Sequence, residues 1–245
     1  MSNNLDQSHA GQDRDPGWNT LCRLGGVAAL VLTLYALETI IQLVILGGQP
    51  ATAIEAFHAL KANRIVGLMR LDFPTILAIP LYYLLFFGLF AALRGAGLAY
   101  VTISTAFVFI GVTLVLATPT ALSMAALSDK YAAAKTEAAR IQLEAVGETI
   151  LATDIWHGTG AFMGGLLVQS GALLICVLML RSPVFGKFIA WVGILVHGLD
   201  LAHIVAGAFL PSVGVVLMAT AGPLYLIWLP LTGRRLLRLG KVSGT

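Results

Sequence analysis

Two histidines and an aspartate stand close together in an otherwise apolar stretch, HGLDLAH at residues 197–203. Such side chains can bind a metal ion, carry protons or form hydrogen bonds between helices. On a helix, His197, Asp200 and His203 step by about −60° each and share one broad face. Hydrogen bonding between helices is the favoured interpretation, because polar side chains commonly join membrane helices in this way. A proton path or a small-molecule site is the main alternative.

A metal site at this stretch is the less favoured hypothesis. The two histidines would lie about 9 Å apart along the helix axis, too far for one ion with bonds of about 2.1 Å to reach both. A third ligand such as His157 or Glu38 could complete a site with one of them if the helices pack that way. The metal candidates are therefore His197, Asp200, His203 and His157, and the sequence assigns no cofactor.

A glutamate lies inside a second apolar stretch, LYALETIIQL at residues 34–43. Tyr35, Glu38 and Gln42 are spaced three and four residues apart and share one helix face. An ionisable group inside a membrane span is costly, which makes Glu38 the first single candidate for a functional group. Gln169, in another apolar stretch, is interpreted as an ordinary packing contact.

The elements that position these groups are membrane helices. The chain has 245 residues, of which 58% are hydrophobic and 11% charged, whereas a soluble domain carries about 25% charged residues. A span needs roughly 20 apolar residues, and six stretches qualify: 25–46, 73–93, 98–119, 158–180, 187–210 and 213–232. The sequence therefore predicts an all-α, polytopic membrane protein, a bundle of six transmembrane helices in the lipid bilayer.

Basic residues predict the orientation of this bundle in the cell membrane. Arg94 and Arg181 lie in short loops on the side of both termini, and the C-terminal GRRLLRLGK adds four more charges there. The positive-inside rule then places both termini in the cytoplasm. We expect a disordered cytoplasmic tail at 1–20, a transmembrane domain at 21–238 and a short cytoplasmic tail at 239–245.

The two long loops on the predicted outer side contain amphipathic helices. After Thr136, a plausible N-cap, apolar residues recur every three or four positions from Ala139 to Thr153. The favoured interpretation is that these helices lie flat on the outer membrane surface, and the alternative is that they cap a cavity between the spans. Arg70 and Asp72 are expected to form an ion pair at the membrane border.

Depth along the spans suggests where a site would open. Glu38 lies about 12 Å below the outer end of its span, and His203, Asp200 and His197 lie about 10, 15 and 20 Å deep. This distribution predicts an outward-facing polar cavity, lined by Glu38, Gln42, His157, His197, Asp200 and His203.

Three runs of sequence resemble one bacterial membrane-protein family. They are LSDKYAAAKTEAARIQLEAVGETILA, QSGALLICVLMLRSPVFGKFIAWVGIL and PLYLIWLPLTGRRLLRLGK. The chain is similar to the family catalogued as domain of unknown function 4386. This resemblance implies a multi-pass helical membrane protein of unassigned activity, and it transfers no catalytic or binding residue. HGLDLAH is not part of the family pattern.

Two classes of function remain. The first is a non-enzymatic membrane protein that binds or passes a small lipophilic molecule or protons, or senses them. The second is an intramembrane enzyme, in which Glu38 or Asp200 acts as general acid or base. A purely structural protein is a third class.

The sequence contains no GxSxG, HExxH, Walker or CxxCH motif. It also lacks a dense basic run that would indicate a nucleic-acid partner. Gly160 and Gly164 form a GxxxG pattern that favours packing within the bundle over homodimerisation.

Overall fold

The computed structural model describes residues 16–118, 120–155 and 157–241, and it confirms the six predicted spans. The spans comprise α2 (Pro16–Ile41), which continues as the π-helical turn η1 (Gln42–Leu46), and α6 (Leu81–Leu93), which is preceded by the short α5 (Phe73–Ala78). The others are α7 (Leu98–Leu116), α10 (Thr159–Arg181), α11 (Lys187–Phe209) and α12 (Pro211–Leu239). The described residues contain no strand.

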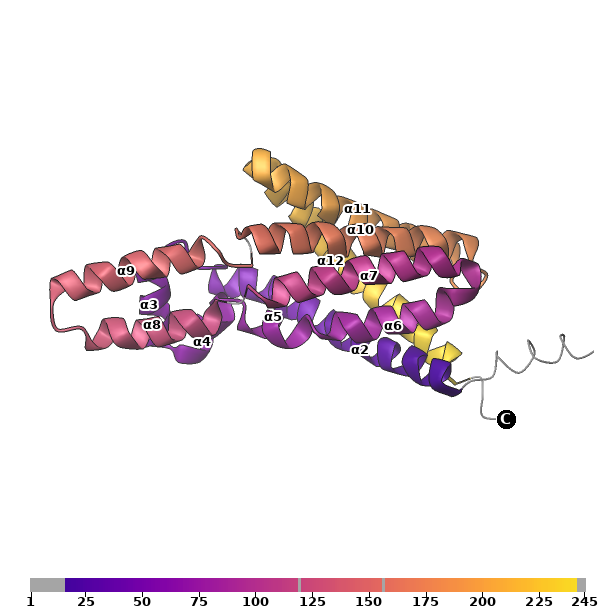
Figure 1. Ribbon diagram of the computed structural model, residues 1–245, viewed down its shortest axis with the longest axis horizontal. Coiled ribbons are helices and arrows are strands. Elements are labelled where there is room, and N and C mark those ends of the chain that lie inside the picture. Colours follow the sequence, from indigo (N-terminus) through magenta and orange to yellow (C-terminus); the bar gives the residue numbers. More distant parts are fainter. Residues whose placement is uncertain (1–15, 119, 156, 242–245) are drawn as a thin grey trace, which may run out of the picture.

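The six spans form a closed ring. Each span packs on the next in the order α2, α6, α7, α10, α11 and α12, and α12 returns against α2. The start of α2 and the end of α12 therefore lie together at one end of the bundle (Figure 1). Helix α2 already begins at Pro16, so residues 16–20 are helical and do not belong to a disordered tail. The rest of that tail, 1–15, and residues 242–245 lie outside the described residues.

Glycines set the close contacts between neighbouring spans. A Cβ at Gly111 on α7 would lie 2.5 Å from the carbonyl oxygen of Gly164 on α10. In lipid no hydrophobic driving force brings helices together, and close packing stabilises their association instead. Small residues at such crossings let the two backbones approach closely. The contact at Gly164 thus confirms the predicted packing within the bundle. A Cβ at Gly160 would instead lie 3.1 Å from a methyl group of Thr118 and would meet no other helix backbone among the residues described.

A separate helical subdomain projects from the end of the bundle opposite the termini (Figure 1). It contains α3 (Ala53–Ala62), α4 (Arg64–Arg70), α8 (Ala121–Ala133) and α9 (Glu137–Leu151). Its own core includes Phe57, Leu60, Met124 and Leu151. The flat arrangement predicted for these helices is wrong: their apolar faces pack on one another, and the α8–α9 hairpin extends along the long axis of the molecule.

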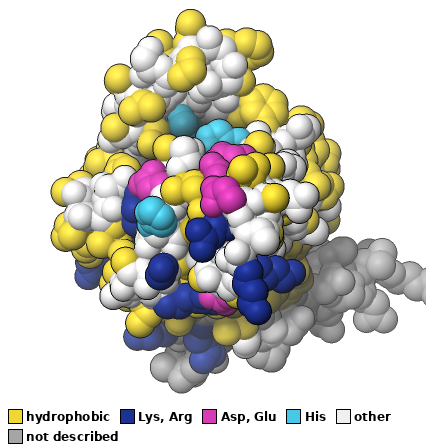
Figure 2. All heavy atoms as spheres, turned by 90° about the vertical axis from the view of Figure 1, so that its left-hand side faces the viewer, with side chains coloured by type: hydrophobic (Ala, Val, Ile, Leu, Met, Phe, Trp, Pro, Cys, Tyr) yellow, Lys and Arg dark blue, Asp and Glu magenta, His cyan; other side chains and the backbone are white. Residues whose placement is uncertain are grey.

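The caps of the subdomain helices are local features of the sequence. Thr136 accepts a hydrogen bond from the Ala139 amide and begins α9 as predicted. Thr52 begins α3 and Asn63 begins α4 in the same way. Seen from this projecting end, basic and acidic side chains cover the lower part of the molecule, whereas the lobe above is mainly apolar (Figure 2). This distribution fits a subdomain in water beside helices in lipid.

Candidate functional site

The HGLDLAH residues lie on α11, and the first two meet partners from both neighbouring helices. The His197 side chain is fully buried. Its Nδ1 lies 2.7 Å from Oε1 of Gln169 on α10, and Nε2 of Gln169 donates to Oδ2 of Asp200 at 2.8 Å. The Tyr225 hydroxyl on α12 donates to the same Asp200 oxygen at 2.7 Å. Gln169 and Tyr225 therefore connect α10, α11 and α12 through one carboxyl group, which we call the Asp200 centre.

The direction of these hydrogen bonds fixes where protons lie. Because Nε2 of Gln169 donates to Asp200, its Oε1 must accept, and His197 must carry a proton on Nδ1. Both neighbours of Asp200 are donors, which is the arrangement that a carboxylate requires. The bonds from Gln169 and Tyr225 both go to Oδ2, so Oδ1 is the oxygen left to take up a proton.

His197 packs edge-to-face against Trp228, with ring centroids 4.7 Å apart and an interplanar angle of 89°. The Nε2 atom of His197 and the indole nitrogen of Trp228 are both buried without a hydrogen-bond partner. The described residues contain no group of three or more His, Cys, Asp or Glu side chains arranged to hold a metal ion. The geometry therefore offers no support for the less favoured hypothesis of a metal site at His197, Asp200, His203 and His157.

His203 has a different contact from the one expected. Its Nδ1 lies 2.9 Å from the Gly214 carbonyl oxygen and joins α11 to the start of α12. His197 and Asp200 are joined through Gln169 of α10, which bonds to both of them. His203 remains within electrostatic range of Asp200.

Tyrosines extend the polar region across the bundle. Tyr82 on α6 is within electrostatic range of both Asp200 and Tyr35. The Tyr35 hydroxyl on α2 lies 2.7 Å from Oγ1 of Thr75 on α5. The contact between Tyr35 and Thr75 therefore joins α2 to α5 outside the Asp200 centre.

Glu38 lies apart from this series, beside a groove that opens on the surface of the bundle. The groove has a volume of about 330 Å³ and is lined by residues of α2, η1 and α4, with none from α11. Gln42 also lines it and donates to the Met69 carbonyl oxygen at 2.6 Å. Both carboxylate oxygens of Glu38 are buried without a hydrogen-bond partner. The prediction of a single cavity shared by Glu38 and Asp200 is therefore wrong.

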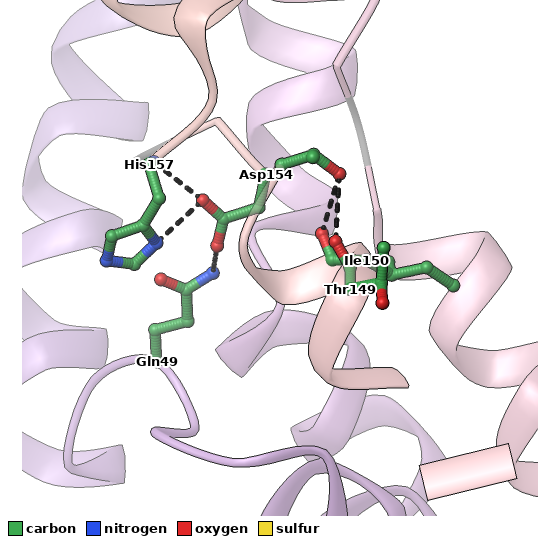
Figure 3. Close-up of polar contacts among 6 residues, drawn as sticks. Gln49, Thr149, Ile150, Asp154 and His157 are labelled. Atoms are coloured by element: carbon green, nitrogen blue, oxygen red, sulfur yellow. Dashed lines mark hydrogen bonds and ion pairs between the residues drawn. The ribbon is translucent and has the colours of Figure 1, made fainter. Parts of the chain in front are cut away.

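His157 belongs to neither site. Asp154, whose side chain is 1% exposed, accepts the backbone N–H of His157 at 2.8 Å and lies 2.9 Å from its Nδ1 (Figure 3). The amide of Gln49 donates to the other Asp154 oxygen at 2.5 Å. The imidazole itself is 65% exposed. This cluster fixes the joint between α9 and α10 onto the 47–52 loop, which is a structural role.

Arg70 also has partners other than the predicted one. It pairs with Glu55 at 2.6 Å and donates from Nε to the Gly48 carbonyl oxygen at 2.8 Å. The Ala51 amide and the Arg70 guanidinium hold the pKa of Glu55 below its usual value. Arg70 therefore joins the end of α4 to α3 and to the loop that precedes it, and these contacts replace the expected ion pair with Asp72.

Sequence reasoning missed Gln169 and Tyr225 as members of the Asp200 centre. A glutamine inside a span was the available signal for the first, whereas Tyr225 resembles any aromatic residue of an apolar helix. Comparison with known proteins gives no guidance, because no family model, curated protein or solved structure matches the chain.

Proposed function

We propose that this multi-pass membrane protein is a non-enzymatic proton sensor, in which Asp200 binds the proton. The observation that carries the proposal is a carboxyl group within a span that accepts two hydrogen bonds on Oδ2. No lysine or arginine pairs with it among the residues described, and the charged form of His203 is within electrostatic range of it. Carboxyl groups in such surroundings change protonation rather than carry an isolated charge.

Protonation would change how α11 is held. The ionised carboxylate receives charge-assisted bonds from Gln169 on α10 and Tyr225 on α12. Such bonds are about twice as strong as bonds between neutral groups. A proton on Oδ1 removes the charge and weakens both bonds, which loosens α11 from its neighbours. The titratable groups that surround Asp200 are His197 and His203 on α11, Tyr225 on α12 and Tyr82 on α6.

Infrared spectroscopy of the reconstituted protein at different pH values tests the proposal directly. We expect a carboxylic-acid C=O band that grows on acidification and is absent from Asp200→Asn. Tyr225→Phe should shift the band, because it removes one hydrogen bond to the carbonyl. Glu38→Gln is the matched control and should leave it in place. Other carboxyl groups of the chain also give such bands, so the part of the signal that Asp200→Asn removes is the test. If Asp200→Asn removes no part of the pH-dependent C=O signal, the proposal is contradicted and the centre is a structural hydrogen-bond network.

We also propose the orientation and family that the sequence suggests. Both termini lie in the cytoplasm and the helical subdomain lies outside, supported by the basic residues of the short loops and the C-terminal segment. Asp200 then responds to external acidity. The three runs of sequence quoted above support membership of the domain of unknown function 4386 family. Protease protection of tagged termini tests the orientation, which fails if either tag is cut from outside.

An intramembrane enzyme acting on a lipophilic substrate has less support. In that hypothesis Glu38 or Asp200 acts as general acid or base and a histidine of α11 holds it, yet the Glu38 groove contains no α11 residue.

A further inference from the structure

The Glu38 groove has the features of a ligand site that is independent of the Asp200 centre. Its walls are apolar side chains of α2 and η1 on one side and of α4 on the other, namely Leu34, Leu37, Ile41, Ile45, Leu46, Val66 and Met69. Its volume of about 330 Å³ falls at the lower end of the range for small-molecule sites. Leu34, Ile41 and Ile45 are exposed on the surface of the bundle. A ligand would therefore enter sideways, from the lipid.

The two polar side chains of the groove, Gln42 and Glu38, differ in whether they have a hydrogen-bond partner. Gln42 is satisfied by the Met69 carbonyl, whereas neither oxygen of Glu38 has a partner, and both are buried. A buried, unpaired carboxyl group is destabilising, and natural membrane proteins retain such groups mainly where they act on a ligand or an ion. The protein itself leaves this position open for a complementary group.

The backbone beside Glu38 is also irregular. Helix α2 changes into the π-helical turn η1 at Gln42 and ends at Gly47, whose φ is 81°. Such π-helical turns occur frequently at functional sites because they redirect side chains within a helix. Here the turn carries Gln42, Ile45 and Leu46 into the wall of the groove.

We propose that this groove binds a lipophilic organic cation, with its apolar body between α2 and α4 and its positive charge paired with Glu38. The carboxylate supplies the only negative charge among the groove residues, all of which the structure describes. A neutral lipid chain would fill the walls and leave Glu38 unpaired, and an anion would be repelled by it. Charge complementarity therefore selects the class of ligand.

Two ions of equal shape and opposite charge provide the test. Binding of radiolabelled tetraphenylphosphonium and tetraphenylborate to the full chain in detergent is measured by equilibrium dialysis. We expect saturable binding of the cation alone. Glu38→Gln should weaken it about thirtyfold or more, since the charge partner is lost. Glu137→Gln, a change at an exposed subdomain acid, is the matched control and should bind like the native chain.

A second variant separates loss of the site from loss of the fold. Val66→Trp fills the groove from α4, keeps the carboxyl group and should also abolish binding. Equal binding of both ions would overturn the proposal, because the groove would then accept apolar molecules whatever their charge. Equal cation binding by the native chain and Glu38→Gln would overturn it in the same way. Asp200→Asn should leave cation binding unchanged, so this result and the infrared result can fail independently.

Discussion

Two carboxyl groups inside the spans, those of Asp200 and Glu38, have opposite surroundings. Asp200 accepts hydrogen bonds from Gln169 and Tyr225 on two other helices. Glu38 has no partner and lies beside an open groove. The comparison shows that the cost of burying an acid can be met in two ways, by other residues of the chain or by something that the chain binds. Only the first kind holds the bundle together.

Gln169→Leu should have the largest effect on this comparison. It leaves the Nδ1 proton of His197 without an acceptor and removes one donor from Asp200. We expect the free energy of unfolding to fall by about 2 kcal/mol, measured in mixed detergent micelles. Ser170→Ala, the neighbouring change, is the control and should have little effect. An unchanged value for Gln169→Leu would mean that the Asp200 centre does not hold α10 and α11 together.

Glu38→Leu should have a smaller effect of the opposite sign. Without ligand, the substitution removes a buried carboxyl group that has no partner and replaces it with an apolar side chain. We expect the free energy of unfolding to rise by about 1 kcal/mol, whereas Asp200→Leu in the same assay should lower it. If Glu38→Leu is the destabilising one, Glu38 is satisfied by the protein in solution and the contrast between the two acids is lost.

An acid outside the spans should give the smallest effect. The pKa of Glu55 is lowered first by the Ala51 amide and then by Arg70, so its ionised form favours the folded subdomain. This stabilisation is fully present above the ordinary pKa and is lost as the pH falls through the lowered value. The side chain is 44% exposed, so the gain is below about 1 kcal/mol. Thermal unfolding should show a smaller loss of stability on acidification for Glu55→Gln than for the native chain, and equal losses would count against the effect.

The sequence predicted the parts of the fold that depend on local pattern. Apolar length alone gives the six spans, and Thr136 marks the start of α9. The sequence could not predict the hydrogen-bond partners of Asp200, because these depend on which helices are neighbours. That adjacency comes from crossings such as Gly111 with Gly164, which are contacts between distant parts of the chain. For the same reason, Glu38 and Asp200 were assigned to one cavity on the basis of depth alone.

The subdomain shows a related limit. The amphipathic pattern of residues 139–153 is the same whether the apolar face meets lipid or other helices. The core around Phe57 and Met124 forms because α3 and α8, from two different loops, meet at the same end of the bundle. Pattern established that these segments are helices, and only their three-dimensional neighbours establish what they cover.

The closed ring has a consequence for biosynthesis. Gly26 on the first span faces the carbonyl of Gly233 on the last, at 2.9 Å from where a Cβ would lie. The ribosome makes α2 before α12, so this surface of α2 has no partner helix until α12 has been made. A chain that ends before α12 would expose this surface, and its Asp200 would lack the Tyr225 hydroxyl. The contact between α2 and α12 is therefore a feature by which chains that contain α12 differ from those that lack it.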